Sequence, residues 1–144
     1  MTAVFVDTSS LFKLYYPEDD SAPVERFILS CDRVLVSALT RVEFGSVAAR
    51  KVRMRELDDE GFRALTSAFS QDWLGGAFRI IALTISLLLE SVSLIERWGL
   101  RRELRTLDAL QLASALSSGC DAFLCHDLRL KALAASCGLT TAEC

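Results

Sequence analysis

The sequence lacks any segment that would span a membrane or direct export. Its longest apolar stretch, residues 80–89, contains Thr84 and Ser86 and ends at Glu90, whereas a bilayer-spanning helix needs roughly 20 apolar residues. The N-terminus reaches Asp7 without the basic region that begins a signal peptide. We therefore expect a soluble protein that stays in the cytoplasm and makes no membrane contact.

Paired cysteines are also missing. The chain has five cysteines, an odd number, and none forms a Cys-x-x-Cys pair, so reduced thiols are expected rather than a disulfide framework. Cys120, Cys125 and His126 are the candidates for zinc ligands. Structural zinc sites use four ligands in paired spacing, so we favour ordinary strand and turn positions for these residues.

An excess of positive charge, the usual footprint of a nucleic-acid binder, is absent as well. The formal net charge is −3. Setting aside four acids that would bind divalent cations changes this value from −3 to +1. The net charge therefore neither supports nor excludes an RNA substrate.

The sequence does contain enough apolar material for one domain with its own core. It has 144 residues, 51% of them hydrophobic, and shows no internal repeat or linker. Strand patterns alternate with helix patterns along the chain, which predicts an α/β fold with a central parallel sheet flanked by helices on both faces. The predicted strands cover residues 4–6, 33–37, 79–83, 122–125 and 139–141, and the predicted helices cover residues 9–15, 22–31, 40–52, 58–73, 85–98, 107–116 and 128–136.

Four acids stand at or near the starts of predicted helices. Asp7 and Asp127 each follow a strand, Glu43 lies three residues after Thr40, and Asp108 opens a later helix. Taken singly, each acid also fits a structural role. Thr40 and Glu43 have the spacing of a capping box. The other three would cap a helix or favour its positive end.

Taken together, the positions of these acids indicate more than capping. The carboxyl ends of parallel strands share one edge of the sheet, where ligands bind, so Asp7, Glu43 and Asp127 should converge there. Clustered carboxylates raise one another's pKa values, and hard divalent cations relieve that repulsion. Asp108 does not follow a strand, so the pattern alone does not place it.

Four segments carry a resemblance to a known family. The chain resembles the PIN domain and, within it, the small toxin endoribonucleases of the VapC type. The matching segments occur in the family's order and at its spacing, and together they span nearly the whole chain. They read Val-Phe-Val-Asp-Thr-Ser-Ser-Leu over residues 4–11, Val-Glu-Phe over 42–44, Leu-Asp-Ala-Leu-Gln-Leu-Ala over 107–113, and Ala-Phe-Leu-Cys-His-Asp-Leu-Arg-Leu over 122–130.

The resemblance implies a single PIN-like ribonuclease domain over residues 1–144 that binds Mg²⁺ or Mn²⁺. Asp7 and Asp108 would be the principal metal ligands and Glu43 and Asp127 would complete the catalytic cluster, so that a metal-activated water cleaves an RNA phosphodiester bond. A hydroxyl group, from Thr8 or Ser9, would lie beside Asp7.

One position departs from the family pattern. The family usually has Thr or Ser two residues before the fourth acid, where this chain has Cys125. A thiol is a weak hydrogen-bonding group, so the substitution bears on the order of the Asp127 side of the site. The neighbouring His126 is not required as a base and is interpreted as an incidental residue at the strand end.

Arginines before the third acid are candidates for binding RNA phosphates. They are Arg101, Arg102 and Arg105, and an equally good interpretation is a solvated run of charge at a helix end. The same two interpretations apply to a second basic run, which comprises Arg50, Lys51, Arg53 and Arg55.

The resemblance also implies protein partners. A VapC-type toxin belongs to a type II toxin–antitoxin pair, so we expect a short antitoxin that inserts an Arg or Lys into the acidic pocket, and a homodimer. An apolar groove between the early helices would hold the rest of the antitoxin, and the alternative for its residues is ordinary packing. These residues are Phe12, Tyr15, Tyr16, Phe27 and Ile28.

Two other functions compete with a ribonuclease. A catalytically idle PIN-like domain would act only as a protein- or RNA-binding module, but the presence of all four acids argues against it. A receiver-type phosphotransferase domain would need an Asp pair after the first strand and a later catalytic Lys, whereas Lys131 falls inside the last predicted helix.

Overall fold

Four parallel strands form one central sheet in the structure, a computed structural model that describes residues 2–144. The strand order is β3-β2-β1-β4, and all neighbours pair in parallel. The predicted last strand is reduced to a single parallel bridge between Phe123 and Thr141. The strands are β1 (Ala3–Val6), β2 (Arg33–Ser37), β3 (Arg79–Ile81) and β4 (Ala122–Leu124).

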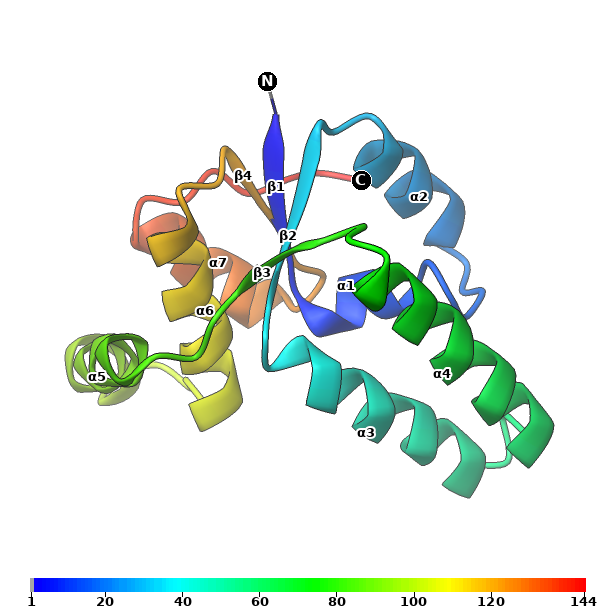
Figure 1. Ribbon diagram of the computed structural model, residues 1–144. Helices are drawn as coiled ribbons and strands as arrows, with labels where there is room; N and C mark the ends of the chain where they lie inside the picture. Colours follow the sequence, from blue (N-terminus) through cyan, green and yellow to red (C-terminus); the bar gives the residue numbers. More distant parts are fainter. Residues whose placement is uncertain (1) are drawn as a thin grey trace.

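Helices cover both faces of this sheet (Figure 1). Helices α1 to α4 lie on one side and α5 to α7 on the other, with α5 packed against α6. This arrangement confirms the predicted α/β fold class. The helices are α1 (Thr8–Phe12), α2 (Ser21–Leu29), α3 (Thr40–Arg53), α4 (Asp59–Leu74), α5 (Ile85–Leu94), a π-helical turn η1 (Ile95–Gly99), α6 (Thr106–Ser118) and α7 (Leu128–Ser136).

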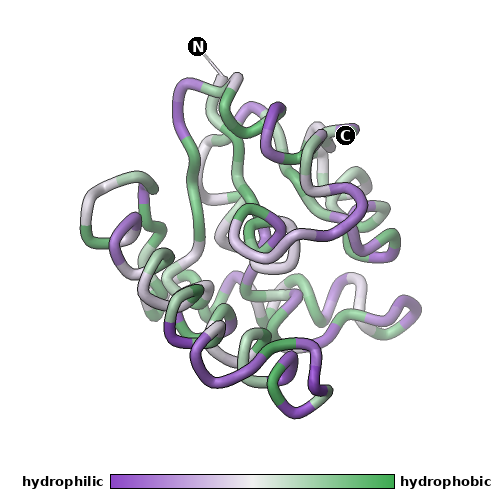
Figure 2. The backbone as a smooth tube through the Cα atoms, turned by 90° about the vertical axis from the view of Figure 1, so that its right-hand side faces the viewer, coloured by the Kyte–Doolittle hydropathy of each residue, from purple (hydrophilic) through white to green (hydrophobic). Residues whose placement is uncertain are grey.

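The core is divided by the sheet because successive side chains of a strand point to opposite faces. Val4 and Val6 of β1 pack with the layer of α1 to α4, while Ala3 and Phe5 pack with α6 and α7. A strand buried on both faces reads as a continuous apolar run. Figure 2 shows this pattern as hydrophobic central strands, with hydrophilic stretches gathered on outward-facing helices and turns.

Two helices and one strand differ from the sequence prediction, and the strand, β3, ends at Ile81 rather than at residue 83. Helix α1 ends at Phe12 rather than at residue 15, and the chain continues in turns in which the Tyr15 amide donates to the Phe12 carbonyl over 3.0 Å. The helix predicted over residues 85–98 is α5 followed by the π-helical turn. None of the helices within residues 2–144 combines the length and the apolar character needed to cross a bilayer.

The aromatic residues of the early helices mostly fill the core. Phe12 and Ile28 are fully buried, so ordinary packing is the correct interpretation for these two. The Tyr15 ring packs edge-on against Phe44 and Phe69. Phe12 of α1 also packs against Phe44 of α3, and α1 and α3 both begin at the sheet edge where the acids lie.

Candidate functional site

A pocket of about 190 Å³ lies at the carboxyl ends of the strands. The four predicted acids line it together with the two predicted hydroxyl residues. They come from the starts of α1, α3, α6 and α7, segments far apart in the sequence. The lining consists of Asp7, Thr8, Ser9, Glu43, Val47, Asp108, Gln111, Asp127 and Leu130.

Asp7 both caps a helix and faces this pocket. Its Oδ1 accepts a hydrogen bond from the Ser10 amide at 3.1 Å, and its Oδ2 accepts from the Ser9 hydroxyl at 2.9 Å. The Cys125 thiol lies 3.5 Å from the same Oδ2. Burial raises the pKa of Asp7 above its usual value, and the hydrogen bonds from Ser10, Ser9 and Cys125 oppose that rise.

Glu43 does not form the capping box that the sequence suggested. Helix α3 has no side-chain cap. The Thr40 hydroxyl is fully buried, and it lies 3.1 Å from the Thr8 hydroxyl instead of capping the helix. Glu43 Oε1 accepts hydrogen bonds from Thr8 Oγ1 at 2.8 Å and from Gln111 Nε2 at 2.6 Å. The carboxylate is therefore turned into the pocket.

The pKa of Glu43 reflects that environment. Burial raises it most, and the hydrogen bonds from Gln111 and Thr8 lower it. The negative charges of Asp7 and Asp108 raise it further. Three of the four acids therefore interact electrostatically inside one pocket.

Asp108 and Asp127 complete the acidic lining. Asp108 lies in the first turn of α6. The position of that helix brings Asp108 to the pocket, which the sequence pattern alone did not predict. Its Oδ2 is 3.4 Å from Arg105 Nε. Asp127 caps α7, because its Oδ1 accepts from the amides of Arg129 at 2.9 Å and Leu130 at 3.2 Å.

The donor set fits a hard divalent cation. It offers carboxylate and hydroxyl oxygens, which Mg²⁺ and Mn²⁺ prefer, and Mg²⁺ retains several waters while taking only a few carboxylates directly. Within residues 2–144, no three acidic, histidine or cysteine side chains are drawn together into a preformed metal cage. The four carboxylates line one pocket of about 190 Å³.

Of the three arginines predicted to bind phosphate, Arg105 alone borders the acidic side chains. It lines a small crevice with Asp108 and Asp127. Arg101 is exposed. The Arg102 guanidinium donates to Ser136 Oγ at 3.0 Å and lies over the Trp98 ring, which directs it away from the pocket.

A second hollow of about 500 Å³ continues from the acidic pocket. The two share Ser9, Val47 and Asp127. The second hollow is lined by Lys13, Arg50 and Lys51 as well. Lys13 is held by Glu18 and Asp20, and Lys51 by Glu56.

Sequence reasoning missed Gln111. It was visible as a polar residue among the alanines and leucines of a buried helix stripe, three residues after Asp108. The sequence analysis interpreted His126 as incidental. Its Nδ1 lies 2.8 Å from the hydroxyl of Ser10, the residue whose amide donates to Asp7.

Solved structures with a similar fold cover nearly the whole chain. VapC20 of Mycobacterium tuberculosis, described as a sarcin–ricin loop cleaving toxin, is 18% identical, and the match covers 98% of this chain and 99% of that one with a TM-score of 0.75. FitAcB from Neisseria gonorrhoeae is 18% identical over 97% and 96% of the two chains, with a TM-score of 0.72. VapBC2 from Rickettsia felis, bound to a fragment of its promoter DNA, is 12% identical over 98% of each, with a TM-score of 0.68.

At these identities, the structural matches establish the fold alone. No functionally curated protein matches the sequence. The family assignment comes from the sequence itself, because the PIN domain model matches residues 4–136, which include all four acids of the pocket. The chain therefore belongs to the PIN domain family.

Proposed function

We propose that residues 1–144 form one Mg²⁺- or Mn²⁺-dependent endoribonuclease domain, the VapC-type toxin of a type II toxin–antitoxin pair acting in the cytoplasm. One observation carries the proposal. Four carboxylates from four distant segments line a single pocket at the carboxyl edge of a parallel sheet, the edge at which such sheets bind ligands. Helix capping explains Asp7 and Asp127 but gives no reason for Glu43 or Asp108 to face the same space.

The residues divide the work of the proposed reaction. Asp7 and Asp108 would be the principal cation ligands, with Glu43 and Asp127 completing the site. When bound, the cation lowers the pKa of a water and stabilises charge on the phosphate. Ser9 holds the Asp7 carboxylate, and Thr8 holds that of Glu43.

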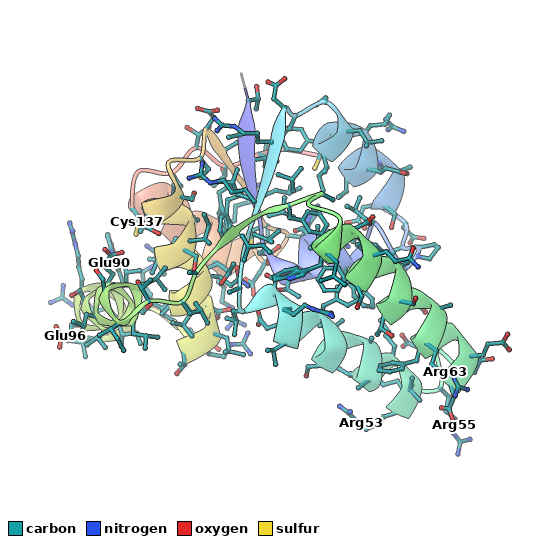
Figure 3. The ribbon with its side chains drawn as sticks, in the orientation of Figure 1. Arg53, Arg55, Arg63, Glu90, Glu96 and Cys137 are labelled. Atoms are coloured by element: carbon teal, nitrogen blue, oxygen red, sulfur yellow. The ribbon has the colours of Figure 1, made fainter. Side chains whose placement is uncertain are left out.

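The RNA strand would leave the acidic pocket along α3. Glu43, Val47, Arg50 and Met54 follow one another at helical spacing, and the last three line the connected hollow. The exposed Arg50 would contact a phosphate there, and Arg105 would contact one on the opposite side. Arg53 and Arg55 lie at the far end of α3 (Figure 3), too remote for the scissile bond.

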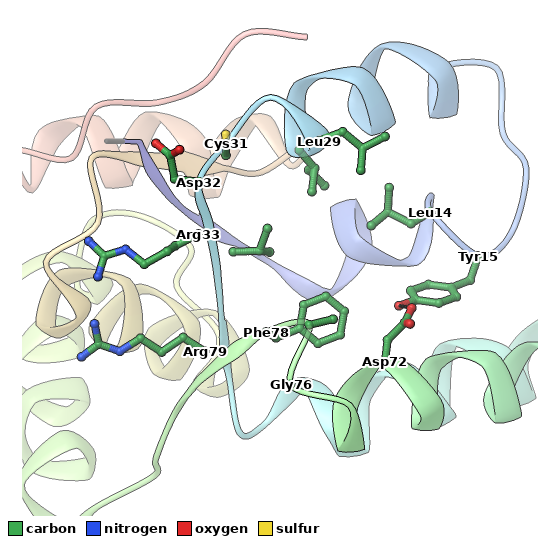
Figure 4. A pocket seen from close by; sticks show the side chains of 13 residues that line it. Leu14, Tyr15, Leu29, Cys31, Asp32, Arg33, Asp72, Gly76, Phe78 and Arg79 are labelled. Carbon is green, nitrogen blue, oxygen red and sulfur yellow. Dashed lines mark hydrogen bonds between the residues drawn. The ribbon is translucent and has the colours of Figure 1, made fainter.

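The antitoxin would engage both edges of the sheet. A basic side chain would enter the acidic pocket and replace the cation's charge. An apolar segment would lie in a pocket of about 490 Å³ at the amino ends of β2 and β3, which includes Tyr15 of the predicted groove. There Arg33 and Arg79 extend side by side (Figure 4), so the segment should carry acidic residues.

A second copy of the chain would cover α5. Four apolar side chains of this helix are exposed, which is more than isolated surface leucines require. Burying them between two copies gives the homodimer expected from the family resemblance. They are Ile85, Leu88, Leu89 and Val92.

The test is cleavage of total RNA by the purified protein with Mg²⁺, Mn²⁺ or EDTA. We expect metal-dependent fragments, and a loss of about 100-fold or more in Glu43→Gln, which keeps the side chain's shape but removes its charge. Arg63→Gln, on the outer end of α4 (Figure 3), is the matched control and should cleave normally. Absence of cleavage with either metal would favour the idle binding module.

A further inference from the structure

Gln111 joins three of the elements that build the acidic pocket. It lies on α6 one turn after Asp108, and only 4% of its surface is exposed. Its Nε2 is 2.6 Å from Glu43 Oε1 on α3 and 3.1 Å from Thr8 Oγ1 on α1. Thr40 Oγ1, at the start of α3, is 3.2 Å away.

The other end of the same amide has no partner. Gln111 Oε1 is buried without a hydrogen-bond donor among residues 2–144, which is costly for a polar atom. Turning the amide over would not remove the cost, because Oε1 would then face the Glu43 carboxylate, another acceptor. A leucine, like the neighbouring Leu112, would fill the same space without an unpaired polar atom. The Nε2 donor is therefore the feature of Gln111 that a leucine would not supply.

We propose that Gln111 is a positioning residue for the cation site. The inference rests on the proposed function, since it concerns the carboxylate of Glu43. Gln111 and Thr8 both bond Oε1 of that carboxylate, which fixes the side chain and leaves Oε2 for the cation. Residues that orient a metal ligand in this way commonly change metal affinity 10- to 100-fold when they are replaced.

The experiment measures Mn²⁺ affinity of the RNA-free protein by titration calorimetry. We expect Gln111→Leu to weaken binding about 10- to 100-fold. In the Glu43→Gln background, the same substitution should have less than about a twofold effect, because coupled residues are non-additive. Gln71→Leu, at an exposed glutamine of α4, is the matched control and should bind like the wild type.

A structural role predicts a different result. If Gln111 only supported packing, Gln111→Leu would weaken binding equally in both backgrounds, and that outcome overturns the inference. Gln111→Met, which keeps the length of the side chain, gives the same test if the leucine variant does not fold. Unchanged affinity in a folded Gln111 variant overturns the inference alone, whereas a wild type that binds no Mn²⁺ overturns the proposed function along with it.

Discussion

The two edges of the sheet carry pockets of opposite chemistry. At the carboxyl ends of the strands, four acids and two hydroxyl residues line a small pocket. At the amino ends of β2 and β3, the larger pocket has apolar walls that include Leu14 and Phe78, with Arg33 and Arg79 at one side. The acidic pocket has residues that directly follow β1 and β4, whereas the apolar pocket is lined by residues of β2 and β3.

The difference matches the ligands proposed for the two pockets. Burial and like charges raise the pKa of Glu43, and burial raises that of Asp7, so the acidic pocket holds repulsion that a cation would relieve. In the apolar pocket, the Tyr15 hydroxyl already donates to Asp72. A partner segment bound there would gain by burying apolar surface, and in the proposed function Arg33 and Arg79 would favour acidic residues on that segment.

The largest effect expected to distinguish the two pockets is stabilisation of the folded protein by metal. Mn²⁺ at 100 times its Kd should raise the free energy of unfolding by about 2.7 kcal/mol, measured by urea denaturation. Asp108→Asn should lose this gain, because it removes a residue proposed as a principal ligand. Arg79→Gln, at the other edge of the sheet, should keep it.

The metal-free form of the same variant tests the competing role of Asp108. Removing a repulsive charge should leave Asp108→Asn as stable as the wild type or more so. Destabilisation by about 1 kcal/mol or more would instead show that the main role of Asp108 is structural, with its negative charge stabilising the N-terminal end of α6.

The next effect concerns the apolar pocket. Replacing Arg33 and Arg79 by Ala together should weaken antitoxin binding about tenfold, because each exposed ion pair contributes up to about 1 kcal/mol. Surface plasmon resonance at two salt concentrations measures this loss, which should shrink as salt screens the wild-type pairs. RNA cleavage should be unaffected. An unchanged antitoxin affinity would place the acidic segment of the partner elsewhere.

The third effect is a pH dependence confined to the acidic edge. Because burial raises the pKa of Asp7, the folded state binds its proton more readily than the unfolded state does. Its contribution to stability is therefore most favourable below the ordinary pKa of an Asp, about 3.9, and is lost as pH rises through the folded-state pKa.

Asp7→Asn should flatten this dependence in EDTA, since the asparagine oxygen still accepts from the Ser10 amide. Urea denaturation between about pH 4 and pH 8 measures the slope, and Arg79→Gln, which removes no carboxyl group, should leave it unchanged. If Asp7→Asn shows the same slope as the wild type, burial of Asp7 is not its source.

The order of elements was predictable from the sequence because it depends on short-range periodicity. Val4 to Val6 is a continuous apolar run, and the strands at residues 33–37 and 79–81 stand between clear helices. The positions of Asp7 and Asp127 followed from the same pattern. Asp108 required the resemblance, because its place depends on how α6 crosses the sheet.

The errors share a physical cause, which is competition from distant partners. The capping box failed because the Thr40 hydroxyl lies within hydrogen-bonding distance of Thr8 and Gln111, which are 32 and 71 residues away. The Arg102 guanidinium likewise has a partner distant in the sequence, since it donates to Ser136 Oγ while it lies over the Trp98 ring, and its role in RNA binding stays a prediction. Gln111 was passed over for the same reason, since its partners lie on two other elements.

The smallest expected effect tests the departure at Cys125. Its thiol is buried against Asp7, with Sγ 3.5 Å from Oδ2 and 3.7 Å from the Asp127 carbonyl. Burial raises the pKa of this thiol, so it stays neutral and acts as a weak donor. A hydroxyl would form a shorter, stronger bond to a carboxylate.

Cys125→Ser should therefore raise kcat/KM for RNA cleavage a few-fold, as Asp7 becomes better ordered. Cys120→Ser is the matched control, because that half-buried thiol donates to the Ala115 carbonyl and does not line the acidic pocket, and its cleavage rate should not change. A slower Cys125→Ser enzyme would mean that the larger sulfur atom is needed to pack between Asp7 and Asp127. The acidic edge would then be adapted to a thiol at this position. The lining of the apolar pocket does not include Cys125, so the wild type, Cys125→Ser and Cys120→Ser should bind antitoxin there equally well.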